Sequence, residues 1–442
     1  MEKPGDMLVV SFLFPPLDYV SGITVSKRII ENNQIVDVLQ SKYDSDKDNK
    51  FNEYLEEFIN QRILVDMDCD VDWSDCIFKF INRGIKHIKK DYSNIYSRSW
   101  LMANHFLAYE YKLKNMSTFW TAEFSDPLIY NLSNKPKSYK QMIIDNDNYI
   151  DCINNEIKRL YPDLDLIENS PSAYFVAEYL VYLFADRIIF TNENQREIML
   201  KQFPVDVHDI VMAKSEIKAH PTLPDKYYHI QETGLKLDDD CINIAYFGGD
   251  YYGKRHFETI FSAFESLNHK HKNKLRFYFF INDQALLKRL ISTLSVKNNI
   301  HVRKPLKYLE FLNATTKFNI LIVNDIVTQG SYDINPYLPS KLSDYLGSKS
   351  DIWSICEEGS TLSKVDVKYK SYIDDYESCR LQLVKILEDN GFVDEEFSFD
   401  EYFMKRLTSL NELYEREFRA NLKLKKQLKE AKSKKGFLKW LK

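Results

Sequence analysis

The chain has 442 residues, a length typical of two or three domains, so a single small module is excluded. Hydrophobic residues make up 44% of the chain, which is enough for folded cores and excludes a wholly disordered protein. Lys and Arg total 60 against 65 Asp and Glu, and the net charge of −5 gives no overall field that would attract nucleic acid, so no nucleic-acid partner is expected.

No targeting or membrane-spanning segment is expected. The first apolar run, residues 7–14, is too short for the core of a signal peptide and has no basic flank. The longest apolar stretch, residues 173–190, contains three charged residues that hydrocarbon would penalise, so it predicts a buried helix followed by a strand. The six cysteines show neither CxxC pairs nor zinc-site spacing, which favours reduced thiols in the cytoplasm.

The first half of the chain alternates predicted strands and helices. Residues 7–14 form a continuous apolar run typical of a strand covered on both faces, and Pro15, Pro16 and Gly22 interrupt it. Thr24 or Ser26 is expected to cap the helix that follows. Further strands are predicted at 62–66, 117–122 and 187–191, and helices at 99–111 and 172–185. This alternation predicts a parallel sheet.

The pattern lapses between residues 214 and 240 and then starts again. Residues 242–249 are predicted to begin it as a strand followed by a loop. Further strands are predicted at 275–281, 300–303, 319–324 and 351–356, and helices at 257–267, 284–294, 308–315 and 339–346. The expected organisation is an N-terminal lobe (1–215), a linker (216–240), a second lobe (241–395), a return helix (396–416) and a basic tail (417–442). Two such lobes predict a ligand site between them, at the carboxyl ends of their strands.

Three loops carry residue types suited to an anionic ligand. Gly22 precedes a helix, where free N–H groups attract anions. Gly248 and Gly249 would allow close approach to a diphosphate, and Lys254 and Arg255 would neutralise it. Near the end, Pro339 favours a helix start, and Lys341 falls in the first turn, where the helix dipole disfavours a cation. A cation at that position indicates a neighbouring anion.

These segments resemble glycosyltransferase family 4 of the GT-B fold. The resemblance rests on FPPLDYVSGIT (14–24), AYFGGDYYGKRHFETIFSAF (245–264) and LPSKLSDYLGSKSDIWSI (338–355), in family order over about residues 7–395. WTAEFSDP (120–127) and ADRIIFTNENQRE (185–197) are similar to further family landmarks. The resemblance implies two Rossmann-like lobes with parallel sheets facing across a cleft, the first (1–215) on the acceptor side and the second (241–395) binding the nucleotide sugar. The implied reaction is transfer of a sugar from a UDP-sugar to an acceptor. The resemblance also implies retention at the anomeric carbon and no bound metal or permanent cofactor.

The resemblance also implies residue roles. The catalytic residues would be Asp126, Lys254 and Arg255. The donor would contact Gly22, Gly248, Gly249, Lys254, Arg255, Pro339, Ser340, Lys341, Leu342 and Asp344, with the Asp344 carboxylate on the ribose hydroxyls. The acceptor side would be Arg98, Ser99, His105 and Asp126. For His105, on an apolar helix, a place in the core is the stronger interpretation.

Departures from the family pattern keep alternatives open. Pro336 stands where the family often has Glu, Asp344 replaces a Glu, and Gly249 replaces a common Arg. A noncatalytic GT-B subunit that stabilises an active partner and a GT-B sugar-nucleotide epimerase are therefore alternatives. The acidic segment 68–72 could be the DxD metal site of the other major glycosyltransferase fold, although two similar lobes favour a solvated loop.

The C-terminal tail has its own charge pattern. Residues 417–442 contain ten Lys or Arg against two Glu, so the tail is +8 and the rest of the chain −13. A Lys-rich helix ending in Phe437, Leu438, Trp440 and Leu441 is typical of a peripheral contact with anionic membrane. The expected setting is the cytoplasmic face of a bacterial membrane, in cell-surface glycan assembly on a glycan, lipid-linked or protein acceptor. A homo-oligomer or a glycosyltransferase complex is a further expectation.

Overall fold

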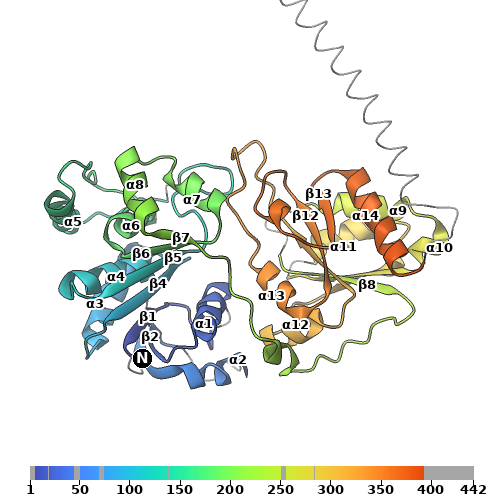
Figure 1. Ribbon diagram of the computed structural model, residues 1–442, viewed down its shortest axis with the longest axis horizontal. Helices are drawn as coiled ribbons and strands as arrows, with labels where there is room; N and C mark the ends of the chain where they lie inside the picture. The colour runs from blue at the N-terminus through green and yellow to red at the C-terminus, as the bar shows by residue number, and fades with distance from the viewer. Residues whose placement is uncertain are drawn as a thin grey trace, which may run out of the picture.

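The computed structural model describes residues 5–17, 19–43, 50–68, 74–137, 139–249, 255–282 and 284–392. These residues form two α/β lobes that lie side by side along the long axis of the molecule (Figure 1). Lys254, the return helix (396–416) and the basic tail (417–442) lie outside the described residues, so the expectations placed on them stay predictions.

The first lobe is built on seven parallel strands in the order β3-β2-β1-β4-β5-β6-β7. They are β1 (Met7–Val10), β2 (Val36–Ser41), β3 (Ile59–Val65), β4 (Asn94–Ser99), β5 (Phe119–Phe124), β6 (Arg187–Phe190) and β7 (Ser215–Ile217). The predicted first strand is confirmed, but it ends at Val10 rather than Phe14. The strand order reverses between β1 and β4, and the carboxyl ends of strands at such a reversal are where open α/β sheets commonly bind ligands.

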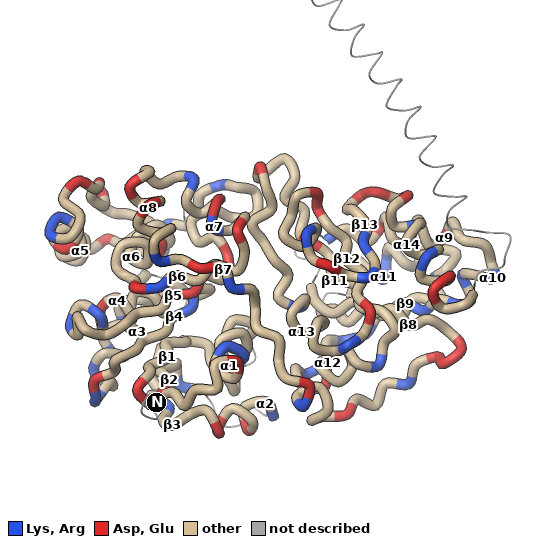
Figure 2. Tube along the Cα trace, in the orientation of Figure 1, with Lys and Arg blue, Asp and Glu red and all other residues tan. Residues whose placement is uncertain are grey.

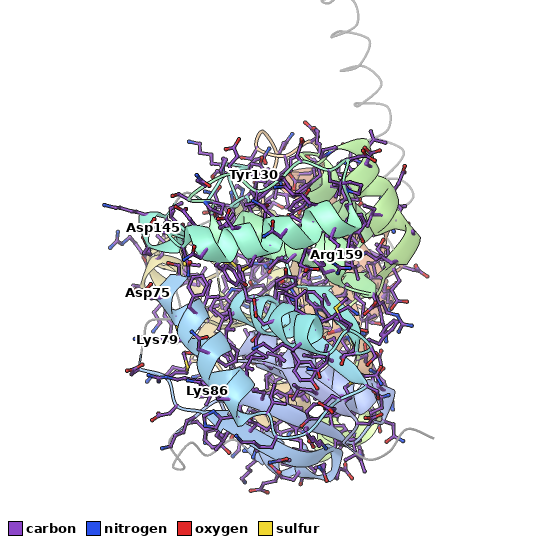
Figure 3. The ribbon with its side chains drawn as sticks, turned by 90° about the vertical axis from the view of Figure 1, so that its left-hand side faces the viewer. Asp75, Lys79, Lys86, Tyr130, Asp145 and Arg159 are labelled. Carbon is purple, nitrogen blue, oxygen red and sulfur yellow. The ribbon has the colours of Figure 1, made fainter. Side chains whose placement is uncertain are left out.

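Helices cover both faces of this sheet. They are α1 (Val20–Asn32), α2 (Lys50–Glu53), α3 (Ser74–His87), α4 (Ala103–Lys114), α5 (Asp147–Leu160), α6 (Ala173–Phe184), α7 (Glu193–Leu200) and α8 (Val205–Lys214), with 3-10 turns η1 (Glu56–Phe58) and η2 (Lys140–Met142). Figure 3 shows the outer face of the lobe, where Asp75, Lys79 and Lys86 of α3 and Arg159 of α5 lie at the surface. Polar residues on the outer face and apolar residues on the inner face are what a helix covering a sheet requires.

Two predicted helix starts are wrong. Helix α1 begins at Val20, and Thr24 and Ser26 lie inside it, where their hydroxyls donate to the carbonyls of Val20 and Gly22 instead of capping. Helix α4 begins at Ala103 rather than residue 99, because residues 94–99 form strand β4.

The second lobe repeats the plan with six parallel strands in the order β10-β9-β8-β11-β12-β13. The strands are β8 (Ile242–Phe247), β9 (Leu275–Phe280), β10 (Ile300–Arg303), β11 (Ile320–Asn324), β12 (Asp351–Cys356) and β13 (Tyr369–Tyr372). The helices are α9 (Glu258–Glu265), α10 (His269–Lys272), α11 (Ala285–Ser292), α12 (Tyr308–Thr315), α13 (Lys341–Ser348) and α14 (Tyr376–Asp389), with 3-10 turns η3 (Asp225–His229), η4 (Lys297–Asn299) and η5 (Leu362–Lys364). The expected two-lobed α/β architecture is confirmed.

The two lobes share one apolar cluster. Val9, Phe14 and Ile23 of the first lobe pack in the same cluster as Leu309 and Leu312 of α12. The rings of Phe51 in α2 and Tyr308 in α12 meet edge to face at 5.0 Å between centroids. The lobes are therefore in direct contact along α1, α2 and α12.

Charged residues of both signs are interspersed along both lobes (Figure 2). None of the helices among the described residues combines the length and apolarity needed to cross a bilayer. Cys152, Cys241, Cys356 and Cys379 are free, but Cys76 is disulfide-bonded, so the prediction of reduced thiols is wrong at Cys76.

Candidate functional site

Buried polar groups gather where the strand order of the second sheet reverses, between β8 and β11. Gly248 follows β8 and Asp325 follows β11, and the two strands are hydrogen-bonded neighbours. The amino end of α13 lies beside them, because Lys341 reaches Gly248. Crevices of this kind, at the carboxyl ends of parallel strands, are where open α/β sheets bind ligands.

Lys341 places in this crevice a side-chain amino group that has no hydrogen-bond acceptor among the described residues. The residue as a whole is half-buried, but its Nζ is shielded from solvent, and no described residue accepts a hydrogen bond from it. Nζ lies 3.9 Å from the centroid of the Tyr246 ring, a cation–π contact. Burial and the neighbouring Arg255 hold the pKa of Lys341 well below its usual value of 10.5. An anion bound here would stabilise the ammonium.

Gly248 makes room for the Lys341 ammonium. Its backbone has φ of +136°, which favours glycine, and a Cβ added there would lie 2.5 Å from Lys341 Nζ. Gly249 follows, and its carbonyl accepts a hydrogen bond of 2.7 Å from the hydroxyl of Tyr246. The two glycines thus border the same crevice as Lys341.

Arg255 extends the crevice toward β11. Its guanidinium donates to the backbone carbonyl of Asn324 and, at 3.2 Å, to the Asn324 side-chain oxygen. Asp325 is also buried, and its Oδ1 has no hydrogen-bond partner within the described part of the chain, nor does Nδ2 of Asn324. Burial raises the pKa of Asp325 to about 7. Sequence reasoning missed Asn324 and Asp325, although their place at the end of an apolar strand was a usable signal.

Asp344, the expected ribose carboxylate, makes contact with the first lobe. Its Oδ1 accepts hydrogen bonds from Lys27 Nζ at 2.9 Å and from the Tyr308 hydroxyl at 3.0 Å. Lys27 Nζ also donates to Ser343 Oγ at 2.7 Å. Lys27 belongs to α1, so this buried ion pair joins the lobes. Of the other predicted donor residues on this segment, Pro339 and Ser340 precede α13 and Leu342 packs in the apolar core.

The predicted acceptor residue Arg98 belongs to a buried charge cluster in the first lobe. Glu123 at the end of β5 accepts from Arg98 Nε at 3.1 Å, from Arg28 Nε at 3.0 Å and from the Tyr96 hydroxyl at 2.9 Å. Burial would raise the pKa of Glu123, but the two guanidiniums outweigh it and lower that pKa to about 2. Arg98 also donates to Ser21 Oγ at 3.3 Å, which ties the cluster to the start of α1.

Asp126, two residues beyond β5, lies at the same edge of the sheet. Ser99 and Phe124 are aligned across β4 and β5, and the Ser125 amide donates to Ser99 Oγ at 3.4 Å. Burial raises the pKa of Asp126, while Arg98 and Lys137 oppose that rise. Asp126, Arg98 and Ser99 are therefore brought together.

His105 and Gly22 have packing roles. His105 is fully buried, its Nδ1 lies 2.8 Å from Ser97 Oγ, and burial lowers its pKa to about 3, so the structure favours the core interpretation over contact with an acceptor. Gly22 lies in the first turn of α1, and a Cβ there would lie 2.0 Å from the carbonyl oxygen of Leu13. Gly22 thus lets the helix lie against the loop that follows β1.

Polar contacts also cross between the lobes on the side of α7. The amide of Asn192 donates to the Pro336 carbonyl at 3.1 Å, and that of Asn194 donates to the carbonyls of Asn335 at 3.0 Å and Gly359 at 3.1 Å. The Tyr332 hydroxyl donates to the Asn131 carbonyl at 2.6 Å. Pro336, one of the departures from the family pattern, thus supplies a backbone contact to the other lobe.

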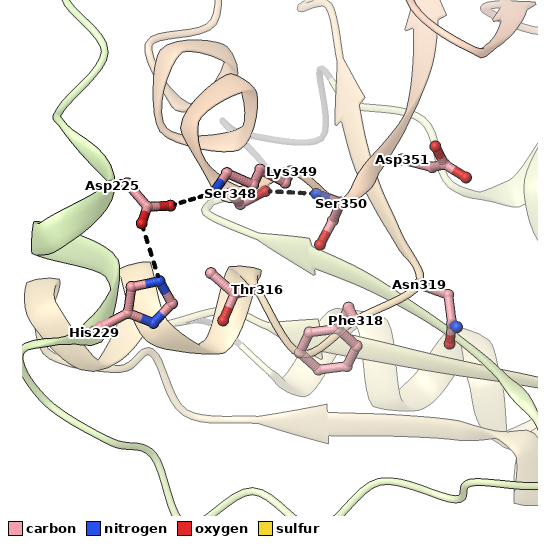
Figure 4. A pocket seen from close by; sticks show the side chains of 9 residues that line it. All are labelled: Asp225, His229, Thr316, Phe318, Asn319, Ser348, Lys349, Ser350 and Asp351. Carbon is pink, nitrogen blue, oxygen red and sulfur yellow. Dashed lines mark hydrogen bonds and ion pairs between the residues drawn. The ribbon is translucent and has the colours of Figure 1, made fainter.

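A separate pocket of about 510 Å³ lies at the opposite edge of the second sheet (Figure 4). Asn319 and Asp351, at the amino ends of β11 and β12, line it together with Asp225, which pairs with Lys349 at 2.7 Å. Because it lies at the amino ends of these strands, it is distinct from the crevice around Lys341. In the part of the chain that the structure describes, no group of three or more His, Cys, Asp or Glu side chains is placed to hold a metal ion.

No protein-family model and no curated protein matches the sequence. Among solved structures, the chain is similar to sucrose-phosphate synthase from Thermosynechococcus elongatus, with 12% identity, a TM-score of 0.53 and coverage of 94% of this chain and 99% of that one. It is also similar to the α,α-trehalose-phosphate synthase (UDP-forming) of Burkholderia xenovorans in complex with glucose-6-phosphate, with 9% identity, a TM-score of 0.51 and coverage of 91% and 100%. With its two parallel-sheet lobes and these structural neighbours, the chain has the GT-B fold.

Proposed function

We propose that this protein is a glycosyltransferase that moves a sugar from a nucleotide-sugar donor, a UDP-sugar, to an acceptor hydroxyl. The observation that carries the proposal is the buried ammonium of Lys341, which has no hydrogen-bond acceptor among the described residues and lies beside Gly248 at the strand-order reversal of the second sheet. A nucleoside diphosphate would supply the missing negative charge there. The GT-B fold and the family 4 resemblance support the same reaction.

The chemistry would consist mainly of stabilising the leaving group. As the bond between the anomeric carbon and the phosphate oxygen breaks, the nucleoside diphosphate takes the electron pair and gains negative charge. Lys341 and Arg255, whose side-chain nitrogens are buried, would meet that charge. The acceptor oxygen forms the new bond to the anomeric carbon and gives its proton to an oxygen of the departing diphosphate, and by family resemblance the configuration is retained. Asp126 would lie on the acceptor side.

The test is nucleotide-dependent thermal stability. A ligand that binds only the folded protein raises the melting temperature with its concentration. We expect UDP or a UDP-sugar, among UDP, GDP, ADP, TDP and CMP compounds, to raise it in the wild type and to have little effect on Lys341→Met. Lys349→Met, at the other end of the same helix and exposed, is the matched control and should respond like the wild type. If no nucleotide raises the melting temperature, the proposal fails and a noncatalytic subunit becomes the better account.

The setting is part of the proposal. We place the enzyme at the cytoplasmic face of a bacterial membrane, in cell-surface glycan assembly, with residues 417–442 binding anionic lipid. Deletion of residues 419–442 should abolish binding to vesicles containing phosphatidylglycerol. Unchanged binding would refute the membrane contact and leave the transferase reaction untouched.

A further inference from the structure

Two exposed aromatic rings flank the strand-order reversal of the first sheet. Tyr19 ends the loop after β1 and directly precedes α1, and Trp100 directly follows β4. Their rings are stacked, with centroids 6.5 Å apart and planes inclined by 28°. Tyr19 is 45% exposed and Trp100 is 50% exposed. A stacked pair of large rings held open to solvent is typical of a binding surface.

The position of the two rings is that of a ligand site. β1 and β4 are parallel neighbours, so the loops that follow them leave the sheet at the same edge and in opposite directions. The α1 helix that starts at these rings carries Lys27, which contacts Asp344 of the other lobe. The rings therefore lie at the amino end of the helix whose Lys27 contacts the proposed donor lobe.

Polar groups lie at the same strand ends as the aromatic pair. Ser21 is half-buried and is fixed by the hydrogen bond from Arg98. Asp126, also half-buried, lies beyond β5 on the neighbouring strand end. A sugar ring has matching chemistry, since its C–H face is apolar and its edge carries hydroxyls. A peptide strand would not fit, because β1 and β4 are each hydrogen-bonded to strands on both sides and offer no free edge.

We propose that Tyr19 and Trp100 form an aromatic platform on which a pyranose ring of the acceptor stacks, with Ser21 and Asp126 receiving its hydroxyls. This inference rests on the proposed function in one respect, that the ring is an acceptor for transfer. It narrows the acceptor class to a sugar or a glycan end, and it disfavours a serine or threonine hydroxyl of a protein. Stacking tolerates different hydroxyl configurations, so several hexopyranosides should bind.

The test is saturation-transfer NMR on the full chain without donor. The sugar probes are the methyl β-pyranosides of glucose, galactose and N-acetylglucosamine, together with glucose 6-phosphate. Sodium octanoate, a fatty-acid chain, tests whether the two rings bind any apolar group. We expect ring-proton signals from pyranosides with wild type and Trp100→Phe, and their loss in Trp100→Ala. Phe119→Ala removes a 41% exposed ring from the amino end of β5, at the opposite edge of the sheet, and should keep the signals.

The outcomes separate the two proposals. The platform is refuted if no pyranoside gives a signal, if signals persist in Trp100→Ala, or if octanoate alone binds in a Trp100-dependent way. UDP should raise the melting temperature of Trp100→Ala as much as that of the wild type. If pyranosides bind through Trp100 but no nucleotide binds, the sugar platform stands and the transferase proposal fails. In a turnover assay with the identified donor, Trp100→Ala should raise the acceptor KM about tenfold and leave the donor KM unchanged.

Discussion

The buried carboxylate of Glu123 offers a prediction whose size follows from its surroundings. Glu123 is fully buried and compensates two guanidiniums, those of Arg28 and Arg98. The fall of its pKa from 4.5 to about 2 corresponds to about 3 kcal/mol of stability at neutral pH, because each pKa unit is worth about 1.4 kcal/mol. Glu123→Gln should lower the stability of the first lobe by that amount or slightly more, since removing one partner of a buried ion pair costs about 3–5 kcal/mol.

The pH dependence distinguishes this electrostatic account from loss of packing. A carboxyl whose pKa is lower in the folded state contributes stability that is complete above its unfolded pKa and is lost as the pH falls through its folded pKa. For Glu123, that window runs from about 4.5 down to about 2. The difference between wild type and Glu123→Gln should therefore shrink from about 3 kcal/mol at pH 7 to about 2 kcal/mol at pH 3.5.

The assay is hydrogen exchange of the amides in β4 and β5, which reports the opening free energy of the first lobe without requiring two-state unfolding of the chain. Tyr96→Phe is the matched control, because it removes a neutral hydrogen bond to the same carboxylate and keeps its charge. It should cost about 1 kcal/mol, with little pH dependence. A Glu123→Gln effect below about 1 kcal/mol, or one that does not change with pH, would refute the reasoning.

Three further predictions concern the lobe contact and the crevice. Lys341→Met removes a buried amino group that has no hydrogen-bond acceptor among the described residues, so it should raise the melting temperature by a few degrees in calorimetry and abolish the response to nucleotide. A lower melting temperature would contradict the view that burial of this group is unfavourable in the absence of ligand. Gly22→Ala should cost at least about 2 kcal/mol in urea unfolding, because the new Cβ would overlap the Leu13 carbonyl, whereas Gly234→Ala, with open space around it, should be neutral. Lys27→Met should lower the melting temperature, because it breaks the buried pair with Asp344, and it should enlarge the rise in melting temperature caused by nucleotide, because the Asp344 carboxylate loses its ion-pair partner. Tyr308→Phe removes only a neutral donor to the same oxygen, so it should change the melting temperature and the nucleotide response less.

Hydrophobic pattern predicted the strands that are apolar on both faces. The apolar runs of β1, β8, β11 and β12 were found, and helix α12 has the predicted bounds, Tyr308–Thr315. β2 and β4 were missed because they bury polar side chains. Asp37 in β2 is buried and accepts from the Tyr92 hydroxyl at 2.6 Å, and Arg98 in β4 is buried against Glu123. A polar residue looks exposed in a sequence when the partner that allows its burial is far along the chain.

The candidate site likewise has a part that the sequence predicts and a part that it does not. The position of Lys341 in the first turn of a helix could be read from its neighbours in sequence, since helix-start signals are local. The Lys27–Asp344 pair joins residues 317 positions apart, and Glu123 meets Arg28 across 95. No local pattern predicts such pairs, because only the packing of one lobe on the other, or of α1 on its sheet, brings them together.

The two kinds of lobe contact determine how the crevice can open. On the side of α1, α2 and α12, separation would expose a shared apolar cluster, and each large side chain uncovered costs about 1.5–3 kcal/mol. It would also break the buried Lys27–Asp344 ion pair between α1 and α13, which costs about 3–5 kcal/mol. On the side of α7, the lobes are joined by hydrogen bonds from Asn192, Asn194 and Tyr332 to backbone carbonyls, which water can replace at a net cost of about 1 kcal/mol each. The Lys201–Asp333 ion pair on this side is exposed and contributes at most about 1 kcal/mol. Figure 1 shows these two sets of elements at opposite ends of the lobe interface. Separation on the α7 side, with the apolar cluster and the Lys27–Asp344 pair kept, would therefore cost less free energy than separation on the α1 side.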